Sequence, residues 1–522
     1  MAELRVALSE IPEDGMTQVA EDGREVLLIR RGDTIHALGA HCPHHHAPLA
    51  EGVLHGDRLL CPWHQSVFDV DNGELLEPPA LDCLDSYPAR VDGDEVVVEL
   101  PDEADGVRAP ELTTEEPAAD DRTFAIIGSG AAAVAAAQEL RRVGYQGRLV
   151  MVSRDDRDPY DRTNCSKDYL AGSAEPEWMP LRSPEMYTDA GIERITHEVR
   201  ELDVSTRRIP LPQGATLEAD ALLLAPGAEP RTLDVPGSDL DGVFTLRTWS
   251  DADRIIAAAD TASRALVVGA SFIAMEAAAS LRQRGVDTVT VVAPETEPFA
   301  AVLGEEVGRV LRSIHEENGV RFRLGRQVEA FEDNGGVAVA VLDNGDRVAT
   351  DLVVIGVGVR PATGFLRGVE LESDGSVRTD ESLRVAAGVW AAGDIATFPD
   401  PRTGEGVRIE HWRLAQQHGQ TAARNMAGAT TAYRGTPFFW TMHFGTSLGY
   451  VGHASRWDEV ILHGSLDEKD FIAFYVAGDR LLAAAGIGRD RQLDALHELM
   501  LEGREPSPER VRAGELDLTE LL

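Results

Sequence analysis

Lysine is almost missing from this chain of 522 residues, since it occurs only at Lys167 and Lys469. Lysine and arginine together number 49, against 89 aspartate and glutamate residues, so the formal net charge is −40. A surface of this sign repels phosphate backbones and anionic lipid headgroups. We therefore expect no nucleic-acid partner and no membrane partner.

The chain also lacks a long apolar run and a basic-apolar leader at its N-terminus, so we expect neither a membrane span nor a secretory signal. Its four cysteines are too few for a disulfide framework. Both features predict a cytoplasmic location, where thiols stay reduced. A single core stops growing at about 250–300 residues, so this chain is expected to form three or four domains.

Two short motifs near the N-terminus combine cysteine with histidine. Cys42-Pro-His44 is followed, after sixteen residues, by Cys61-Pro-Trp-His64. This is the ligand pattern of a Rieske [2Fe–2S] centre, in which two thiolates hold one iron and two imidazoles hold the other. Tetrahedral zinc is the alternative for such a set, but zinc fingers usually pair like ligands, whereas each motif here is mixed. The neighbouring His41, His45 and His46 are not expected to be ligands.

The residues around these motifs resemble the two cluster-binding loops of soluble Rieske ferredoxins. Gln65 stands where glycine is common in such loops, and Cys83 lies outside both of them. Apolar runs at 25–29 and 95–100 are bounded by turn residues, which is typical of strands. We therefore predict an all-β Rieske domain over residues 1–104. The acidic, proline-containing segment 105–121 has the composition of an interdomain linker.

A different pattern begins at Arg122, where predicted strands alternate with helices as in parallel α/β domains. A strand at 123–127 runs into Gly128-Ser-Gly130-Ala-Ala-Ala133, an alanine-rich helix and a second strand at 148–152. The arrangement recurs with a strand at 265–268, Gly269-Ala-Ser271-Phe-Ile-Ala274 and a strand at 288–292. This unit binds a dinucleotide, whose pyrophosphate rests on the helix N-terminus. Two such units predict two dinucleotides.

From Arg122 to its C-terminus the chain resembles the pyridine nucleotide-dependent flavoproteins, and more narrowly the apoptosis-inducing-factor-like and ferredoxin reductases. The segments that carry the resemblance are 159–162, 166–167, 224–227, 389–394, 410–413 and 437–440. The attached Rieske motifs resemble the Rieske-bearing branch of that family. The resemblance implies a multidomain fold, with an N-terminal all-β Rieske domain, an α/β flavoprotein of two dinucleotide-binding domains, and a C-terminal α+β interface domain. The implied boundaries are 122–247 with 363–433 for FAD, 248–362 for NAD and 434–522 for the interface domain.

By family order the first unit binds FAD and the second binds NAD. The residues implied for FAD are Gly128, Ser129, Gly130, Ala131, Ala132, Asp155, Arg162, Lys167, Ala225, Pro226, Gly227, Gly393, Asp394 and Trp412. Those implied for NAD are Gly269, Ser271, Phe272, Ile273, Glu276, Glu295, Gly356 and Gly358. Glu295 is an acid near the expected ribose, with no arginine next to it in the sequence. A carboxylate accepts the 2′-hydroxyl and repels a 2′-phosphate, so NADH is expected rather than NADPH.

These cofactors together predict an electron-transfer enzyme. NADH gives up two electrons together and a Rieske cluster accepts one, while flavin converts between the two. The predicted order is NADH, FAD, the chain's own cluster, and then an external one-electron acceptor such as an oxygenase, a cytochrome or another ferredoxin. The candidate catalytic residues are Lys167 at the flavin, Glu276 at the nicotinamide and Trp440 between flavin and cluster. Family members often associate through the C-terminal domain, so a homodimer is also expected.

Two alternatives stay open at this point. Cys165 begins an expected helix near the flavin, where the helix dipole and Lys167 would stabilise a thiolate. Flavoproteins that reduce coenzyme A disulfide or persulfide use a single cysteine in a comparable region. The other alternative is a non-enzymatic redox-signalling role, which rests on fold analogy alone.

Overall fold

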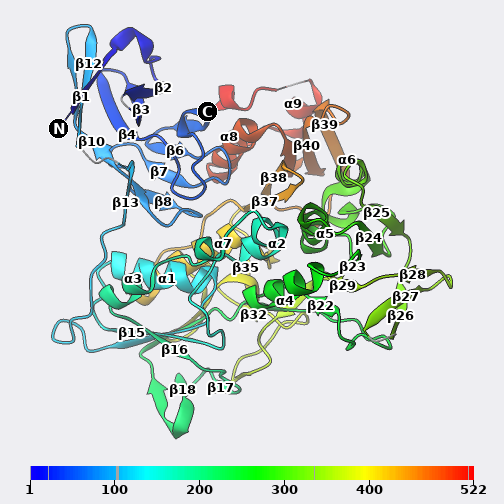
Figure 1. The fold of residues 1–522 in the computed structure, drawn as a ribbon. Helices are drawn as coiled ribbons and strands as arrows, with labels where there is room; N and C mark the ends of the chain where they lie inside the picture. Colours follow the sequence, from blue (N-terminus) through cyan, green and yellow to red (C-terminus); the bar gives the residue numbers. More distant parts are fainter. Residues whose placement is uncertain (1, 22, 102–104, 334–335, 515) are drawn as a thin grey trace.

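The chain folds into four modules, of which the second is formed by two segments on either side of the third (Figure 1). The computed structural model describes residues 2–21, 23–101, 105–333, 336–514 and 516–522. Residue 104, the predicted end of the first domain, lies outside the described residues. No helix in these ranges combines the length and the apolar character that a bilayer crossing requires.

The N-terminal module is made of antiparallel β-sheets, as the sequence predicts. Its sheets are β1–β12–β11, β10–β4–β3–β2 and β5–β6–β7–β8. The strands are β1 (Ala2–Ala7), β2 (Met16–Glu21), β3 (Arg24–Arg31), β4 (Thr34–Gly39), β5 (Val53–His55), β6 (Arg58–Leu60), β7 (Val67–Asp69), β8 (Leu75–Glu77), β10 (Ser86–Tyr87), β11 (Ala89–Asp92) and β12 (Glu95–Leu100). The two cysteine–histidine motifs lie on loops at the edges of the third sheet, before β5 and between β6 and β7.

The segment between the first two modules is bound at both of its ends. Its first part forms β13 (Val107–Arg108), which pairs with β9 (Cys83–Leu84) of the N-terminal module. Farther along, the Thr113 hydroxyl donates to the carbonyl of Arg141, and the Glu116 amide donates to the carbonyl of Gln146, both in the second module. The segment is therefore packed against both neighbours.

The second module contains a parallel sheet with the strand order β16–β15–β14–β20–β34, closed by the antiparallel β33. Buried apolar strands alternate here with α1, whose alanines let it pack closely against α7. The elements are β14 (Thr123–Ile127), α1 (Ala131–Arg142), β15 (Arg148–Ser153), α2 (Asp168–Ala171), α3 (Pro184–Asp189), β16 (Ile192–Thr196), β20 (Ala221–Leu224), β33 (Arg384–Ala386), β34 (Val389–Ala391) and α7 (Trp412–Met426). The chain returns to this sheet at β33 only after completing the third module.

The third module repeats the plan with the parallel sheet β22–β29–β23–β24–β25. Its elements are β22 (Val243–Thr245), α4 (Trp249–Ala259), β23 (Arg264–Val268), α5 (Phe272–Arg284), β24 (Thr288–Ala293), α6 (Ala300–Glu317), β25 (Arg321–Leu324) and β29 (Leu352–Ile355). A smaller antiparallel sheet is formed by β26 (Val328–Asp333), β27 (Val337–Leu342) and β28 (Arg347–Ala349). Minor strand pairs in these two modules are β17 (Leu202–Asp203) with β31 (Leu366–Arg367), β18 (Arg208–Pro210) with β19 (Thr216–Glu218), β21 (Ala228–Pro230) with β30 (Val359–Pro361), and β35 (Ala396–Pro399) with β32 (Val377–Arg378) and β36 (Gly406–Val407).

The C-terminal module is an antiparallel sheet with the order β37–β38–β41–β40–β39, covered by α8. Its elements are β37 (Phe438–His443), β38 (Thr446–Gly452), β39 (Glu459–Ser465), β40 (Asp470–Ala477), β41 (Arg480–Ile487), α8 (Asp490–Leu501) and α9 (Pro508–Arg512). Leu522, at the end of the chain, packs against apolar residues of the N-terminal module. The first and last modules therefore lie side by side above the two α/β modules (Figure 1).

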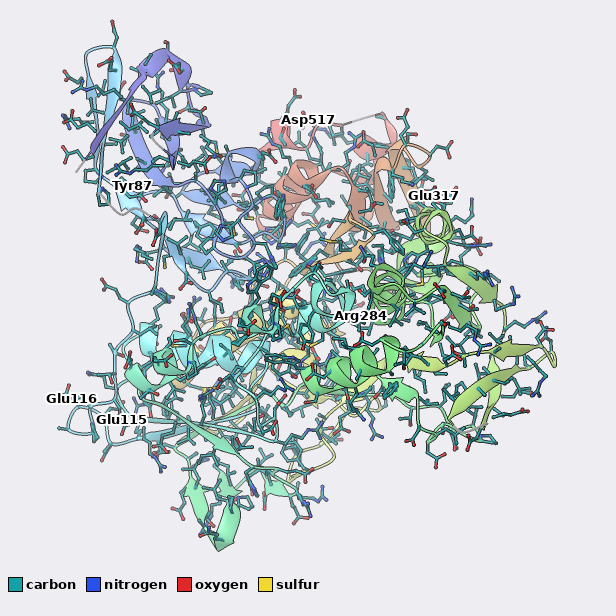
Figure 2. All side chains as sticks on the ribbon, viewed as in Figure 1. Tyr87, Glu115, Glu116, Arg284, Glu317 and Asp517 are labelled. Carbon is teal, nitrogen blue, oxygen red and sulfur yellow. The ribbon has the colours of Figure 1, made fainter. Side chains whose placement is uncertain are left out.

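Acidic side chains are spread over the whole molecule. Glu116 in the segment between the first two modules, Glu317 on the third module and Asp517 on the C-terminal module are all exposed (Figure 2). Glu317 is paired with Lys469, one of the two lysines, at 2.6 Å. The excess negative charge is thus distributed across the surface.

Candidate functional site

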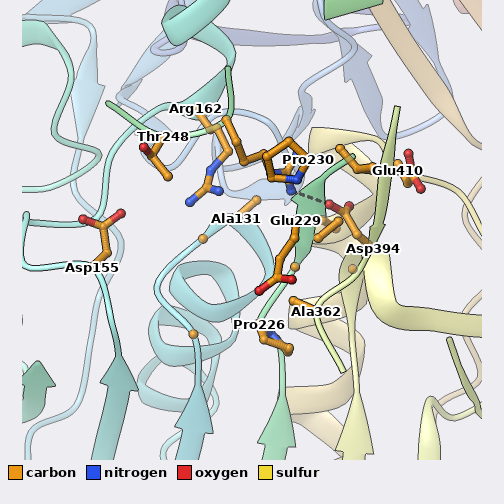
Figure 3. A pocket seen from close by; sticks show the side chains of 18 of the residues that line it. Ala131, Asp155, Arg162, Pro226, Glu229, Pro230, Thr248, Ala362, Asp394 and Glu410 are labelled. Atoms are coloured by element: carbon orange, nitrogen blue, oxygen red, sulfur yellow. Dashed lines mark hydrogen bonds and ion pairs between the residues drawn. The ribbon is translucent and has the colours of Figure 1, made fainter. Parts of the chain in front are cut away.

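A cavity of about 1120 Å³ opens where the second, third and C-terminal modules meet. Drug-sized ligands occupy pockets of about 300–1,000 Å³, so this cavity is large enough for an extended ligand such as a dinucleotide. Figure 3 shows Asp155, Arg162 and Asp394 around it, with Ala131 at the start of α1. Every residue that the sequence implies for FAD lines this cavity.

The end of β14 and the start of α1 form a backbone cradle in the cavity wall. Gly128 has φ +124°, and a Cβ there would lie 2.1 Å from the carbonyl oxygen of Ala225, so only glycine fits. Gly130 caps α1 without a side-chain hydrogen bond, which leaves N–H groups of the first turn without a capping side chain. An open helix N-terminus of this kind suits a pyrophosphate.

Polar side chains around the cradle are held in place by neighbours. The Asp155 carboxylate accepts from Tyr160 Oη at 3.0 Å, and Asp394 accepts from Arg247 Nη2 at 2.6 Å. Within the described part of the chain, Arg247 Nε and His411 Nδ1 are buried without a hydrogen-bond partner, and both residues line the cavity. Buried polar atoms are rarely left unpaired, so these two atoms indicate a polar ligand.

Lys167 and Glu276 form a buried ion pair in the wall of the cavity. Lys167 Nζ lies 2.9 Å from Glu276 Oε2, and their side chains are 13% and 3% exposed. Ser166 Oγ donates to the same oxygen at 2.6 Å. The two residues come from different modules, so the pair joins the first dinucleotide unit to the second.

The residues implied for NAD are only partly brought to the cavity. Those in the cavity wall are Ser271, Phe272, Ile273, Glu276, Gly356 and Gly358. Gly269 is not part of the cavity wall. It packs so closely against the residue after β29 that a Cβ would lie 2.3 Å from the carbonyl oxygen of Gly356. Glu295 is exposed beyond the end of β24 and is outside the cavity wall.

The surroundings of Glu295 differ from what the sequence suggests. Its carbonyl accepts from the amide of Gly325, and the amide of Arg326 donates to Ala293 nearby. The fold therefore brings an arginine close to this segment, although none is adjacent along the chain.

The structure argues against the redox role considered for Cys165. Its side chain is 2% exposed and packs in the apolar core between the second and third modules, outside the cavity wall. Burial raises the pKa of the Cys165 thiol to about 12. The positive charge of Arg162 favours a thiolate, but the cost of desolvation is larger. The expected helix start is also wrong, because Cys165 lies inside the short 3-10 turn Arg162–Ser166 and α2 begins only at Asp168.

The two cysteine–histidine loops have the same backbone shape. In each loop the cysteine N–H donates to the carbonyl five residues later, and the cysteine carbonyl accepts from the amide four residues later. That fourth residue is His46 in one loop and Gln65 in the other, and both have φ +57°. A left-handed conformation at this position explains why glycine is common where this chain has Gln65.

The four predicted ligands gather as two separate pairs. His44 Nδ1 and His64 Nδ1 are 3.0 Å apart, and the free, buried thiols of Cys42 and Cys61 contact each other. Burial lowers the pKa of both histidines well below its usual range, so their imidazoles are neutral, the form that binds metal.

This arrangement favours a two-iron cluster over a single zinc ion. Around one tetrahedral zinc all donor atoms would lie within about 3.3–3.8 Å of one another. Among the described residues, which include all four ligands, no three of these donors fall within 4.8 Å of one another. A sulfur pair and a nitrogen pair fit two irons of a [2Fe–2S] cluster instead.

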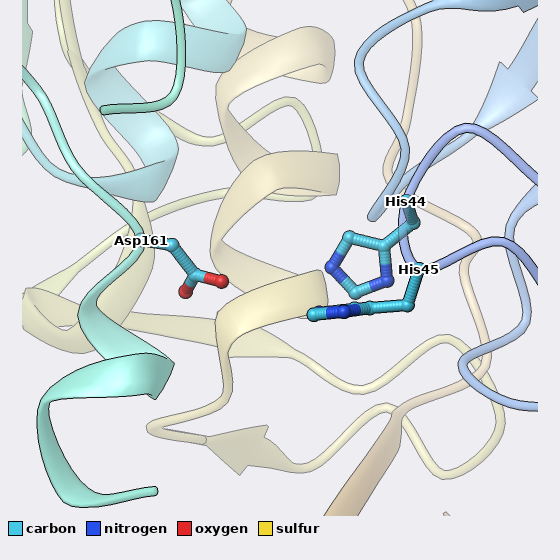
Figure 4. Close-up of side chains that lie close together, drawn as sticks. All are labelled: His44, His45 and Asp161. Carbon is cyan, nitrogen blue, oxygen red and sulfur yellow. The ribbon is translucent and has the colours of Figure 1, made fainter. Parts of the chain in front are cut away.

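One other group of potential metal ligands includes His44. His44, His45 and Asp161 have donor atoms within 4.8 Å of one another. Figure 4 shows the three side chains, two from the first cluster loop and one from the second module. The Asp161 carboxylate already accepts from the amide and hydroxyl of Thr163. This group therefore marks where the first cluster loop faces the second module.

Trp440 lies between the cavity and the cluster loops. Its indole centroid is 4.3 Å from that of the His64 imidazole and 5.9 Å from that of His44. Trp440 also lines the cavity. One side chain of β37 thus contacts both predicted cofactor sites.

A buried arginine fixes the N-terminal module on the rest of the chain. Arg413, at the start of α7, is fully buried and donates to the backbone carbonyls of Gln65 and Pro78 at 3.1 and 2.9 Å. Its Nη2 donates to Glu77 at 2.7 Å. Glu77 also binds Arg58, which in turn reaches Glu498 of α8 at 2.6 Å. This ionic network joins three modules beside the His64 loop.

Some of these residues could not be singled out from the sequence. Arg413 and His411 lie in a segment that resembles the family, but nothing in the pattern separates them from their neighbours. Arg247 lies between the two α/β modules in the sequence, outside the segments that carry the family resemblance. Only the fold places it against Asp394.

Comparison with known proteins covers nearly the whole chain. Family models match for a Rieske [2Fe–2S] domain at residues 4–88, a pyridine nucleotide-disulphide oxidoreductase at 122–419 and a reductase C-terminal domain at 438–522. Apoptosis-inducing factor 3 of Homo sapiens is 36% identical over 94% of this chain and 83% of its own length. Rhodocoxin reductase of Rhodococcus erythropolis is 33% identical over 76% of this chain and 93% of its own length.

Solved structures agree with these matches. A ferredoxin reductase for the CYP199A2 system of Rhodopseudomonas palustris superimposes with a TM-score of 0.72 at 29% identity, and covers 76% of this chain and 99% of its own. The covalent complex of putidaredoxin reductase with putidaredoxin gives 0.72 at 28% identity, covering 77% and 98%. The chain belongs to the pyridine nucleotide-disulphide oxidoreductase family, as a ferredoxin-reductase-like FAD flavoprotein that carries its own Rieske [2Fe–2S] domain.

Proposed function

We propose that this flavoprotein takes electrons from NADH and passes them, by way of FAD, to its own Rieske centre and then singly to an external acceptor protein. The observation that carries the proposal is the contact of Trp440 with His64 on one side and with the cavity on the other. When bound, FAD supplies the conversion of a two-electron donor into a one-electron donor.

The chain's own residues hold and orient the cofactors. The start of α1 would bind the FAD pyrophosphate. The Arg247–Asp394 pair would bind polar groups of the same FAD molecule. Lys167 places a positive charge in the cavity wall, where it would stabilise negative charge on the bound flavin. Glu276 fixes that charge from the NAD side.

The position of the Rieske module supports transfer within one chain. Arg413 holds the carbonyl of Gln65, the residue after His64, in a fully buried site. Side chains in such networks are costly to separate, so the module is docked rather than loosely tethered. The histidine ligands face Trp440 and therefore face the flavoprotein.

The preference for NADH is part of the proposal. Several relatives are named ferredoxin–NAD(+) reductases of dioxygenase systems, among them the benzene 1,2-dioxygenase subunit of Pseudomonas putida, which is 32% identical over 72% of this chain. Arg326 near Glu295 is the residue that would favour a 2′-phosphate instead. Comparing kcat/KM for NADH and NADPH in the protein and in Arg326→Ala tests this preference.

The external acceptor is proposed from the same names. Because several of the relatives are named as reductase components of dioxygenase systems, a ferredoxin or an oxygenase component is the proposed acceptor here. A homodimer through the C-terminal module and a cytoplasmic location are also proposed. Size-exclusion chromatography with light scattering tests the dimer.

The proposed order is tested with two artificial acceptors. Ferricyanide can take electrons directly from the reduced flavin, whereas cytochrome c is expected to take them from the cluster. His64→Ala removes one cluster ligand, so it should abolish cytochrome c reduction and spare ferricyanide reduction. Equal loss of both activities, with FAD still bound by its visible spectrum, contradicts this order.

A further inference from the structure

A row of buried hydrogen bonds leads from the Lys167–Glu276 pair away from the cavity. Glu276 Oε1 accepts from Thr441 Oγ1 at 2.7 Å, and Thr441 Oγ1 lies 3.0 Å from His443 Nε2. His443 Nδ1 lies 3.2 Å from His315 Nε2. Thr441, His443 and His315 are all fully buried. The row runs from α5 through β37 to α6.

The donor and acceptor at each step follow from the chemistry of the groups. A carboxylate only accepts, so the single hydroxyl proton of Thr441 goes to Glu276. Thr441 Oγ1 must then accept from His443, which places a proton on His443 Nε2 and leaves its Nδ1 bare. A bare Nδ1 accepts from His315, so the proton of His315 is also on Nε2. The whole row is thus oriented toward Glu276.

The surroundings of the two histidines agree with this assignment. His315 Nδ1 has no hydrogen-bond partner among the described residues, as a bare acceptor in an apolar pocket would. The rings pack against Phe299, Phe322 and Phe444. Burial lowers the pKa of His443 to about 3 and that of His315 well below its usual range, and nearby Lys167 further disfavours charge on His443. Both imidazoles are therefore neutral, with one proton each.

Glu276 depends on this row for one of its two oxygens. Ser166 and Lys167 both bind Oε2, whereas Oε1 accepts only from Thr441 among the described residues. Without that hydroxyl a buried carboxylate oxygen would lack a partner, which is costly for a charged group. The carboxylate would then reorient, and Lys167 would move with it.

We propose that Thr441, His443 and His315 are positioning residues, which hold Glu276 as an ionised acceptor and thereby fix the Lys167 ammonium at the flavin site. The inference rests on the proposed function, since it adds residues to the same site. It predicts one tautomer for each histidine, with the proton on Nε2.

Nitrogen-15 NMR of the holoprotein labelled at histidine tests the tautomers directly. With the cluster oxidised, His443 and His315 should both show a protonated Nε2 and a bare Nδ1. In Thr441→Val the His443 Nε2–H loses its acceptor while its tautomer stays the same, so the proton resonance of this N–H should move upfield. A charged imidazole or an Nδ1–H form in the unaltered protein overturns the proposal, and so does an unshifted His443 Nε2–H resonance in Thr441→Val.

Stopped-flow reduction of the flavin by NADH tests the positioning role. Loss of a hydrogen bond to a charged group slows a step by about ten- to a hundredfold, and loss of a neutral one by about three- to tenfold. Thr441→Val, which removes the bond to Glu276, should therefore slow flavin reduction more than His443→Phe, which removes only the neutral bond to Thr441. His443→Gln keeps an N–H near the Nε2 position and should restore most of the rate. An equal rate in Gln and Phe variants, each with full FAD content, contradicts positioning.

His463 supplies the matched control. It lies on β39 of the same C-terminal module, and its Nε2 lies 2.9 Å from the carbonyl oxygen of Val511. His463→Phe should leave the flavin step within twofold of the unaltered protein and should not change the other two tautomers. The NMR experiment uses no NADH, so its result does not depend on the proposed function. If both histidines show the expected tautomers but the protein cannot reduce ferricyanide with NADH, the proposed function is refuted and the hydrogen-bonded row is not.

Discussion

The indole of Trp440 lies 4.3 Å from the imidazole of His64, measured between ring centroids, and the two rings are tilted by 46°. The first residue belongs to the C-terminal module and the second to the Rieske module. Since Trp440 also lines the cavity, the two cofactor sites are separated by a single aromatic side chain at this point. The relative positions of the modules therefore matter for electron transfer within the chain.

Replacing Trp440 should lower the reduction of cytochrome c much more than the reduction of ferricyanide. Trp440→Ala removes the packing that orients His64, and misplacing a reacting group costs about ten- to a hundredfold. We expect cytochrome c reduction to fall by that factor while ferricyanide reduction stays within twofold. Trp440→Phe keeps a ring and should retain more of the cytochrome c activity. If all acceptors lose activity equally in Trp440→Ala, the residue acts on the flavin instead.

Breaking the buried network at Arg413 should destabilise the docked Rieske module. Arg413→Met leaves Glu77 without one of its two arginines and removes two bonds to backbone carbonyls. Removing one partner of a buried pair costs about 3–5 kcal/mol, and denaturant unfolding should show this loss. The matched control is Arg200→Met at an exposed site, which should change the free energy of unfolding by less than about 0.5 kcal/mol. Equal stability of the two variants would contradict the role given to Arg413.

The same network predicts a dependence on acid. Although burial opposes ionisation, the His497 hydrogen bond and the Arg58 charge lower the pKa of Glu498 to about 2, against about 4.3 in an unfolded chain. Its contribution is thus complete above about pH 4.3 and is lost as the pH falls toward 2. The difference in unfolding free energy between the protein and Glu498→Gln should be largest near neutral pH and should shrink in acid. A difference that stays constant with pH refutes this assignment.

Cys165 should be dispensable for turnover. Its thiol is buried and its raised pKa keeps it protonated at neutral pH, so it should not react with iodoacetamide in the folded protein. We expect Cys165→Ala to keep NADH-dependent activity within about twofold, with a stability loss of about 1 kcal/mol. Loss of turnover in a folded, FAD-loaded variant would revive the single-cysteine mechanism.

The fold and much of the site follow from local patterns in the sequence. The strands at 123–127 and 265–268 and the glycine-rich turns after them are recognisable because backbone geometry restricts which residues fit there. The fold class is confirmed, and the two mixed motifs do bring Cys42, Cys61, His44 and His64 together as two pairs. Contacts between distant segments could not be predicted. Arg413 meets Gln65 across 348 positions, and no periodic pattern encodes such a pair.

Where the surroundings of a residue differ from what the sequence suggests, tertiary packing is the cause. Cys165 does lie in the segment next to Lys167, but its burial in an apolar core cannot be foreseen from an expected helix start alone. Glu295 follows β24 as expected, yet its side chain is exposed outside the cavity wall. In both positions the surroundings come from other parts of the chain.

Anaerobic titration with NADH, followed by visible and EPR spectroscopy, tests the central claim most directly. The account predicts that NADH bleaches the flavin and produces the EPR signal of a one-electron-reduced, histidine-ligated [2Fe–2S] cluster, with about two irons per chain. In His64→Ala the flavin should still bleach while that signal is absent. Bound zinc in place of iron, or a cluster that stays oxidised while the flavin is fully reduced, would contradict the account.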